Sequence, residues 1–538
     1  MALNEAKIPR DNVDETKEEV GRLQQYKNLT KHEELRRRRT ECSVEIRKQK
    51  GADMMMKRRN IVDDVEEEFA SESEVDEPKK QPTVRLSNDE IKSILSNNPS
   101  ENDMIRCFES LRKSLSKTKN PPIDEVIQSG LLIALVQALT VQSERVQYEA
   151  AWALTNIVSG TTEQTIAAVE AGATAPLIQL AVHSSSQISE QALWAVANIA
   201  GDSAQLRDYV IKCHGVEALM FLVEKLEQFT DSHVRTIAWA FSNMCRHKNP
   251  NAPLDVLRVL AQGLVKLVQS LLSCCFQHPD IQVRQDACWA VSYLTDGPDE
   301  QIQLACDSGV LPHIVKYFKH AENLVAPALR TLGNVATGND SLTQSVIDLG
   351  CLKRLVPLME KTKSSSITKE CCWLISNIIA GTHAQIQSVL DAKLLPLIIN
   401  IFQYGDHKCQ FEASWALSNL VQGGTVNQIY ALMECNAVPA LCQALKQTNT
   451  DMLTNTLETL SLLMTAVQDC YSQELEVLLD QVEENGGLDA LERLQESQSE
   501  RIYELAYSII TQFFTDDDGA NAENNLATRS DHDAPWSF

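Results

Sequence analysis

The chemistry of this chain centres on a tryptophan followed four residues later by an asparagine, a pair that occurs five times. Residues four apart on a helix share one face, so each pair would place an indole beside a carboxamide. A carboxamide can hold the N–H and C=O of an extended peptide whatever its side chains are. An indole attracts the stem and the cation of lysine or arginine. We call this series the ladder, and its pairs are Trp152/Asn156, Trp194/Asn198, Trp239/Asn243, Trp373/Asn377 and Trp415/Asn419.

Acidic residues beside the ladder are candidate anchors for lysine. Asp202 and Asp340 each follow a ladder segment, whereas Asp286 and Glu412 stand three residues before a tryptophan. Helices pack about 8–10 Å apart and an extended chain rises about 3.3 Å per residue. One repeat would therefore contact two to three residues of a linear motif rich in lysine and arginine.

A purely structural origin of the ladder is the alternative interpretation. Tryptophan is common in cores, but asparagine is an indifferent helix former that competes for backbone hydrogen bonds. Five asparagines at one helical phase would cost stability without a packing return, and this recurrence favours a binding surface.

The ladder also sets the fold, because its positions recur every 41 to 50 residues. Periods of about 40–47 residues indicate units of two or three helices stacked as a solenoid, and no segment alternates as a strand would. Glycines three or four residues after the ladder asparagines are expected to end helices in a left-handed cap. The equivalent ladder positions are Trp152, Trp194, Trp239, Trp289, Arg330, Trp373, Trp415 and Leu457, and the glycines are Gly160, Gly201, Gly297, Gly338, Gly381 and Gly423.

Charge divides the chain into a basic arm and an acidic remainder. Residues 22–59 hold 13 Lys/Arg and 5 Asp/Glu, a net charge of +8. Because the net charge of the whole chain is −24, the other residues carry a net charge of −32. An acidic solenoid does not suit nucleic acid, whose phosphates need basic partners, but it suits a cationic ligand. The acidic stretch 61–88 is expected to be a disordered linker, and 515–538 a disordered acidic tail.

Several functional classes find no support in the sequence. There is no secretory signal and no apolar run of 18 residues, so no membrane span is expected. The 15 cysteines form no zinc-type spacing, and their placement predicts reduced, buried thiols. No phosphate-binding loop, zinc-protease motif or catalytic triad is evident, so we expect no enzyme activity, cofactor or metal.

The basic arm contains two clusters. Leu23–Lys50 is rich in helix formers but too poor in apolar residues to fold alone, so it should become helical on an acidic partner. A second cluster, Lys57-Arg58-Arg59, stands close to the solenoid in sequence. The opposite charges predict that the chain binds its own N-terminal segment.

The ladder, the Arg36–Arg39 block, the Lys57–Arg59 cluster and the acidic linker together resemble the importin α family of nuclear import adaptors, from about Arg22 to about Phe514. The resemblance implies an all-α, right-handed superhelical solenoid of about ten armadillo repeats with a disordered basic arm. The implied domains are an importin-β-binding and autoinhibitory arm at 1–60, the linker at 61–88, the solenoid at 89–514 and the tail at 515–538.

The resemblance also implies two sites for classical nuclear localisation signals, with one or two basic clusters, in a concave groove. The major site would use Trp152, Asn156, Gly160, Thr165, Gln191, Trp194, Asn198, Asp202, Trp239 and Asn243, and the minor site Asn334, Asp340, Trp373, Asn377, Glu412, Trp415 and Asn419. Between them lie Asp286, Tyr293 and Arg330, where the Trp/Asn pattern is interrupted.

The partners that the resemblance implies are importin β, cargo signals, and the nuclear export receptor acting with RanGTP on the last repeat. Importin β would bind Arg22, Arg36, Arg37, Arg38 and Arg39, and Lys57, Arg58 and Arg59 would be autoinhibitory. The implied location is the cytoplasm and the nucleus, with shuttling through the nuclear pore.

Two departures from the family pattern stand out. Thr236 occupies a position where the family usually has asparagine, which would weaken one backbone clamp. The step from Trp239 to Trp289 is about eight residues longer than usual, and we expect the surplus near Gln269–Asp280 to extend a loop or helix end. A rival interpretation is an armadillo scaffold of the adhesion or signalling type. Proteins of that class generally have a basic groove and no such basic arm, whereas the groove candidates of this chain are acidic.

Overall fold

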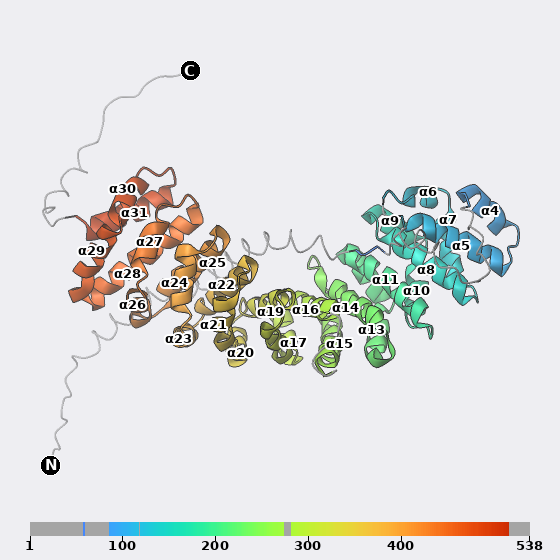
Figure 1. Cartoon of the computed structure of the whole chain (residues 1–538), viewed down its shortest axis with the longest axis horizontal. Helices are drawn as coiled ribbons and strands as arrows, with labels where there is room; N and C mark the ends of the chain where they lie inside the picture. Colours follow the sequence, from blue (N-terminus) through green and yellow to red (C-terminus); the bar gives the residue numbers. More distant parts are fainter. Residues whose placement is uncertain (1–56, 60–85, 118, 274–280, 516–538) are drawn as a thin grey trace, which may run out of the picture. The chain divides into compact units, whose positions relative to one another are not determined.

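The computed structural model describes residues 57–59, 86–117, 119–273 and 281–515, and the regular secondary structure in these ranges is helical, with no strand. The chain forms two compact units, Met1–Leu358 and Met359–Phe538, which are described separately. In both, the helices come in groups that end with a long helix (Figure 1), and the eight ladder positions all lie on such helices. The all-α, repeat-based fold expected from the period is confirmed.

The first unit begins with two helices that precede the first full group. Its elements are α4 Asn88–Ser96, α5 Glu101–Leu115, α6 Ile123–Gln128, α7 Leu131–Ala138, α8 Glu144–Val158, α9 Thr162–Glu170, α10 Thr174–Ala181, α11 Ser186–Asp202, α12 Ala204–Lys212, α13 Gly215–Val223, η2 Leu226–Gln228, α14 Asp231–Arg246, α15 Leu254–Ser273, α16 Ile281–Leu294, α17 Asp299–Asp307, α18 Leu311–Ile314, η3 Val315–Lys319, α19 Glu322–Val335 and α20 Asp340–Asp348. Helix α21, Leu352–Lys361, crosses the boundary between the units.

The second unit repeats the same plan. Its elements are α22 Ser365–Ile379, α23 His383–Asp391, α24 Leu395–Tyr404, α25 His407–Gly423, α26 Val426–Glu434, α27 Val438–Ala444, α28 Thr450–Cys470, η4 Ser472–Glu474, α29 Leu475–Glu484, α30 Gly487–Leu494 and α31 Glu500–Phe513.

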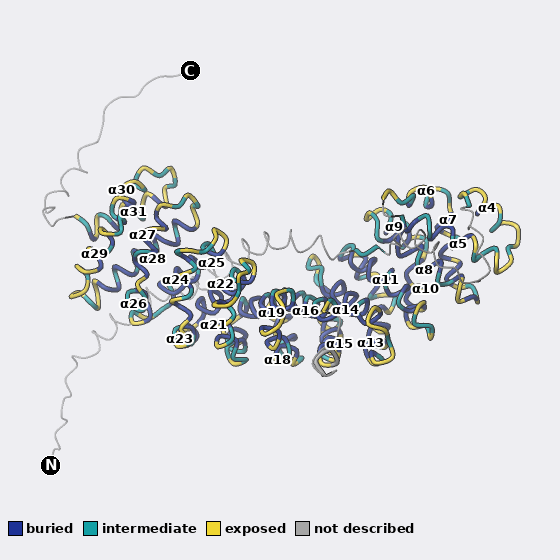
Figure 2. Tube along the Cα trace, in the orientation of Figure 1, coloured by how far each residue is buried: buried dark blue, intermediate teal, exposed yellow. Residues whose placement is uncertain are grey.

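The long helices form one layer in each unit because each packs on the long helix of the next group. Helices α5, α8, α11, α14, α16 and α19 follow one another in this way in the first unit, and α22, α25, α28 and α31 in the second. Figure 2 shows buried residues along these helices, with exposed residues gathered at the turns. Leu154 and Ile157 of α8, for example, are fully buried. The layer gives every ladder residue a fixed position along its unit.

The expectation that the ladder glycines form left-handed caps is wrong. None of the six has a positive φ; that conformation occurs instead in the turn after the first short helix, as at Gly172 (φ 89°). A Cβ at Gly160 would lie 1.9 Å from Oε1 of Gln164, so the Gln164 side chain would have to move. That oxygen accepts from the N–H of the helix cap residue. Gly381 stands in the same relation to Gln385 in the second unit.

The long step between Trp239 and Trp289 includes α15, which spans 20 residues, whereas α10 and α13 have 8 and 9. The remaining surplus, 274–280, lies outside the described residues, so the expected loop extension stays a prediction. Among the described residues, no single helix has the length and apolar composition of a membrane span, although the bent pair α23–α24 passes that test jointly.

Candidate functional site

The ladder residues occupy equivalent places on the long helices. The pairs lie on α8, α11 and α14 in the first unit and on α22 and α25 in the second. Trp152, Trp194 and Trp415 are half-buried, whereas Trp239 and Trp373 are nearly fully buried. The rings of Trp194 and Trp239 meet edge to face, with centroids 6.4 Å apart.

The ladder asparagines also hold successive long helices together. Nδ2 of Asn243 donates to the carbonyl of Ala197 (2.9 Å), and Nδ2 of Asn419 donates to Ser376 (2.9 Å). Asn334 and Asn198 make the same contact with Ser292 and Thr155. The expectation that these residues bring no packing return is therefore wrong, because each contact pairs a buried amide N–H with a main-chain carbonyl and contributes about 1 kcal/mol.

A short segment of the chain's own N-terminal region, Lys57–Arg59, lies on this surface of the first unit. The main chain of Arg58 is held at both polar groups. Its N–H donates to Oδ1 of Asn198 (2.8 Å), and its carbonyl accepts from Nε1 of Trp194 (2.7 Å) and Nδ2 of Asn198 (2.9 Å). One indole and one carboxamide thus bind the main chain of Arg58.

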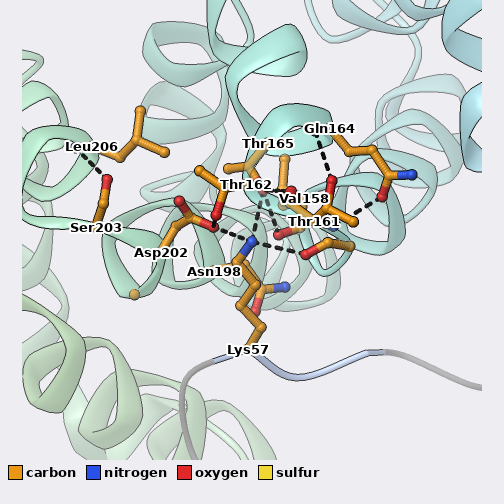
Figure 3. A network of polar contacts seen from close by, with 12 residues as sticks. Lys57, Val158, Thr161, Thr162, Gln164, Thr165, Asn198, Asp202, Ser203 and Leu206 are labelled. Atoms are coloured by element: carbon orange, nitrogen blue, oxygen red, sulfur yellow. Dashed lines mark hydrogen bonds and ion pairs between the residues drawn. The ribbon is translucent and has the colours of Figure 1, made fainter. Parts of the chain in front are cut away.

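The Lys57 ammonium enters a set of acceptors that we call the lysine site (Figure 3). Nζ donates to the Gly160 carbonyl and to Oγ1 of Thr165, both at 2.9 Å, and forms an ion pair with Asp202. The side chains of Lys57 and Asp202 are 14% and 2% exposed. Three acceptors match the three donors of an ammonium group, and carbonyls at a helix C-terminus favour a cation.

Arg58 enters a different set, the arginine site, made by Trp239, Asp286 and Gln282. Its guanidinium carbon lies 4.7 Å from the centroid of the Trp239 ring, and Nη2 lies 2.9 Å from each Asp286 oxygen. Gln282 orients the carboxylate by donating to Oδ1 (3.2 Å). Burial raises the pKa of Asp286, and Arg58 acts in the opposite direction. Asp286 was predicted as a lysine anchor, but here it binds arginine.

Arg59 lies at the C-terminal end of α5. Its Nη2 donates to the Leu115 carbonyl (2.8 Å) and to the Lys117 carbonyl. The last carbonyls of a helix have no partner within the helix, and they carry its partial negative charge. This contact was not predicted, because main-chain acceptors leave no side-chain signature in the sequence.

The other predicted major-site residues lie beside these contacts. A guanidinium from the body of the protein, that of Arg112 on α5, already covers the Trp152 ring at 4.4 Å. Gln191, one turn before Trp194, donates to Oγ1 of Thr155 (2.8 Å) and so joins α11 to α8. Nδ2 of Asn156 donates to Ser116 (3.0 Å).

The interruption of the ladder is aromatic and cationic. Tyr293 stacks on Trp289 at 6.1 Å, and the guanidinium of Arg246 lies 5.5 Å from the Tyr293 ring. Burial raises the pKa of Tyr293, which keeps its phenol neutral. Arg330 is half-buried on α19. These groups place positive charge at the interruption.

The predicted minor-site residues fall in both units. Asn334 and Asp340 belong to the first unit; Asn334 is buried, and Asp340 is exposed as the first residue of α20. The second unit contains Glu412, buried one turn before Trp415, and the buried Asn419. The carboxamide oxygen of Asn419 is buried without a partner in the described part of the chain. Trp373 and Asn377 are also buried, on α22.

Some signals in the sequence were missed, and some predicted residues cannot be placed. Thr-x-x-Gln capping boxes at Thr161/Gln164 and Thr382/Gln385 start the helices after ladder segments, and their spacing is recognisable. Gln282, four residues before Asp286, was missed as well. The importin-β-binding candidates Arg22 and Arg36–Arg39 lie outside the described residues.

This arrangement is suited to binding a cationic segment. It presents carbonyls, carboxylates and indoles to cationic side chains, and the described ranges contain no cluster of metal ligands. Fold and site together define a helical-repeat protein that holds the basic segment Lys57–Arg59 of its own chain on its long helices.

Comparison with known proteins identifies the family. An importin beta binding domain model matches residues 22–107, armadillo/beta-catenin-like repeats match 119–159, 161–201, 264–296, 339–380, 382–422 and 425–465, and an atypical Arm repeat matches 476–529. The chain is 75% identical to importin subunit alpha-2 of Caenorhabditis elegans over 542 residues, covering 100% of both chains. It is 35% identical to importin subunit alpha-1a of Oryza sativa, covering 92% of each.

The chain therefore belongs to the importin α family of nuclear import adaptors, and it is a transport protein rather than an enzyme. An engineered protein of known structure has the same fold, with a TM-score of 0.68 at 24% identity, over 80% of this chain and 100% of its own.

Proposed function

We propose that this adaptor binds lysine- and arginine-rich nuclear localisation signals along the ladder and links them to importin β through its basic arm. The observation that carries the proposal is the binding of Lys57–Arg59. Its backbone contacts Trp194 and Asn198, and the Lys57 ammonium occupies the lysine site. A cargo signal with the same local sequence would make the same contacts.

The same observation supports autoinhibition. Lys57, Arg58 and Arg59 use the acceptors that a cargo signal would need, so arm and cargo exclude each other. A tethered ligand meets its site at an effective concentration of about 1 mM. With an intrinsic Kd of about 10 μM, the arm would occupy the site about 99% of the time and weaken cargo binding about 100-fold.

Importin β would reverse this inhibition. By binding the segment that contains Arg22 and Arg36–Arg39, it would withdraw Lys57–Arg59 from the ladder. Arm release and cargo binding would then be coupled with equal strength in both directions. Loss of importin β in the nucleus would favour cargo release. The export receptor with RanGTP would bind at the last repeat and return the adaptor to the cytoplasm, so that it shuttles through the pore.

A second basic cluster would bind near α22 and α25 of the second unit. Support comes from the buried acid Glu412 beside Trp415 and from the unpartnered oxygen of Asn419. Signals with two clusters would gain from effective concentration when both sites are engaged. Asn334 and Asp340, which are predicted for the minor site, belong to the first unit, and their part in cargo binding stays a prediction.

Calorimetry with a lysine-rich signal peptide and a charge-neutralised control tests the proposal. The chain should carry Lys57→Ala/Arg58→Ala/Arg59→Ala so that the ladder is open. We expect micromolar or tighter binding of the basic peptide, and a loss of at least about 100-fold when Trp194→Ala and Asn198→Ala remove the backbone clamp. Equal binding of the neutral peptide, or unchanged affinity in a folded double variant, would contradict it.

A further inference from the structure

Adjacent subsites on the ladder differ in the geometry that they offer to a cation. In the lysine site a carbonyl, a hydroxyl and a carboxylate all contact the single side-chain nitrogen of Lys57. The arginine site instead offers the face of Trp239 and a carboxylate at its edge, which suits a flat, delocalised cation.

The position of the Arg58 backbone fixes how far its side chain must reach. Three hydrogen bonds from Trp194 and Asn198 hold the main chain, so the Cα cannot move toward Asp286 without breaking them. From Cα, a lysine nitrogen is one bond nearer than the terminal nitrogens of arginine. A lysine at this position would stop short of the carboxylate that Nη2 reaches at 2.9 Å.

The carboxylate is also costly to leave without its cation. Asp286 is 0% exposed, and Gln282 supplies its neutral hydrogen bond. The free energy needed to remove water from an ammonium group is larger than for a guanidinium group, because the guanidinium is more weakly hydrated. The guanidinium also stacks on aromatic rings. When a buried charge has a poorly placed partner, the free energy lost on desolvation exceeds the free energy gained from the ion pair.

Thr236 removes the alternative acceptor that a lysine could use. It is buried one turn before Trp239 on α14, and its hydroxyl donates to the Ser232 carbonyl of its own helix (3.2 Å). A carboxamide at this place would present an oxygen to an ammonium group close to the clamped backbone. The threonine hydroxyl is instead engaged with the main chain of its own helix.

We propose that Thr236, Trp239 and Asp286 make this subsite selective for arginine over lysine, so that the major site recognises the ordered dipeptide Lys-Arg. This inference rests on the proposed cargo-binding function. The arm itself has the preferred order at Lys57-Arg58, and it would therefore compete best with Lys-Lys signals. Cargo with Lys-Arg would open the adaptor more readily.

Four otherwise identical peptides carrying Lys-Arg, Lys-Lys, Arg-Arg or Arg-Lys test the inference on the full chain with Lys57, Arg58 and Arg59 changed to alanine. We expect Lys-Arg to bind about tenfold more tightly than Lys-Lys, and more tightly than either peptide that begins with arginine. Equal affinity for Lys-Arg and Lys-Lys would overturn the selectivity but leave cargo binding intact. If no peptide binds, the proposed function fails as well.

Two variants assign the selectivity to residues. Asp286→Asn should weaken Lys-Arg and reduce its advantage to less than about threefold, and Thr236→Asn should improve Lys-Lys. An unchanged advantage in either folded variant would overturn that residue's role.

An independent experiment leaves the subsite unchanged. Arg58→Lys in the complete chain should raise the apparent cargo affinity about ninefold, because the arm then binds about tenfold less tightly. No rise would overturn the inference.

Discussion

Neutralising Asp202 should affect cargo binding very differently with and without a functional arm. Asp202→Asn keeps an oxygen near Thr162, which donates to Oδ1 at 3.3 Å, and removes an acid from the C-terminal end of α11, where the helix dipole disfavours it. Unfolding stability should therefore be unchanged or slightly higher. The variant removes the charge that pairs with Lys57.

The size of the loss follows from the burial of the pair. With Lys57 and Asp202 only 14% and 2% exposed, a charge-assisted contact is weakly screened. Its removal should cost roughly 3 kcal/mol, or about 100-fold in Kd for a lysine-containing peptide. This full loss should appear in the chain whose arm carries Lys57→Ala/Arg58→Ala/Arg59→Ala.

In the chain with its natural arm, the same variant should lose only about twofold. The arm's own Kd also rises about 100-fold, to about 1 mM, so the arm occupies the site only about half of the time. In the apparent Kd for cargo, the weaker cargo contacts and the weaker inhibition by the arm then almost cancel. Calorimetry on both backgrounds tests this, with Glu163→Gln as a control because that acid is exposed next to the site.

Two results would refute the reasoning. A loss of about 100-fold in both backgrounds would mean that the arm does not occupy the lysine site. No loss in either background would mean that Asp202 does not anchor the lysine. The exposed control should change affinity by less than about threefold in either chain, which separates a specific anchor from general acidity.

Three further predictions concern other parts of the chain. Gly160→Ala should destabilise the fold by about 1 kcal/mol and weaken single-cluster peptides about tenfold, because the new Cβ displaces the cap beside the lysine site; Gly381→Ala should cost similar stability in urea unfolding without changing that affinity. Burial lowers the pKa of His233 to about 4, so folding stability should fall by about 3 kcal/mol as pH drops from about 6.5 to about 4, and a folded His233→Gln should flatten that dependence. Trp415→Ala with Glu412→Arg should weaken two-cluster peptides at least about tenfold while changing single-cluster peptides less than about threefold; equal losses would contradict a separate second site.

The sequence predicts the repeat and the backbone clamp well, because both depend on side chains at fixed helical spacing. The four-residue spacing of Trp194 and Asn198 is enough to place them side by side on one helix face. In the structure both side chains hydrogen-bond the main chain of Arg58, and their role in binding cargo stays a prediction. Asp202 and Thr165 also converge on a lysine, as the family resemblance implied.

What the sequence did not predict depends on main-chain atoms and on distant contacts. Asn243 also donates to the main-chain carbonyl of Ala197, which lies 46 residues away in the sequence. Any residue type at that position would supply the same carbonyl. The binding of Arg59 to the end of α5 has the same origin. The preference of Asp286 for arginine follows from how the neighbouring helix places Trp239, which spacing within one helix cannot specify.

The central claim is that Lys57–Arg59 closes the ladder and importin β opens it, and one titration tests it most directly. A fluorescent cargo peptide is titrated with the natural chain and with the Lys57→Ala/Arg58→Ala/Arg59→Ala variant, each with and without importin β. We expect importin β to raise the cargo affinity of the natural chain about 100-fold and to leave that of the variant unchanged. If the natural chain alone binds cargo as tightly as the variant, the arm does not inhibit and the claim is contradicted.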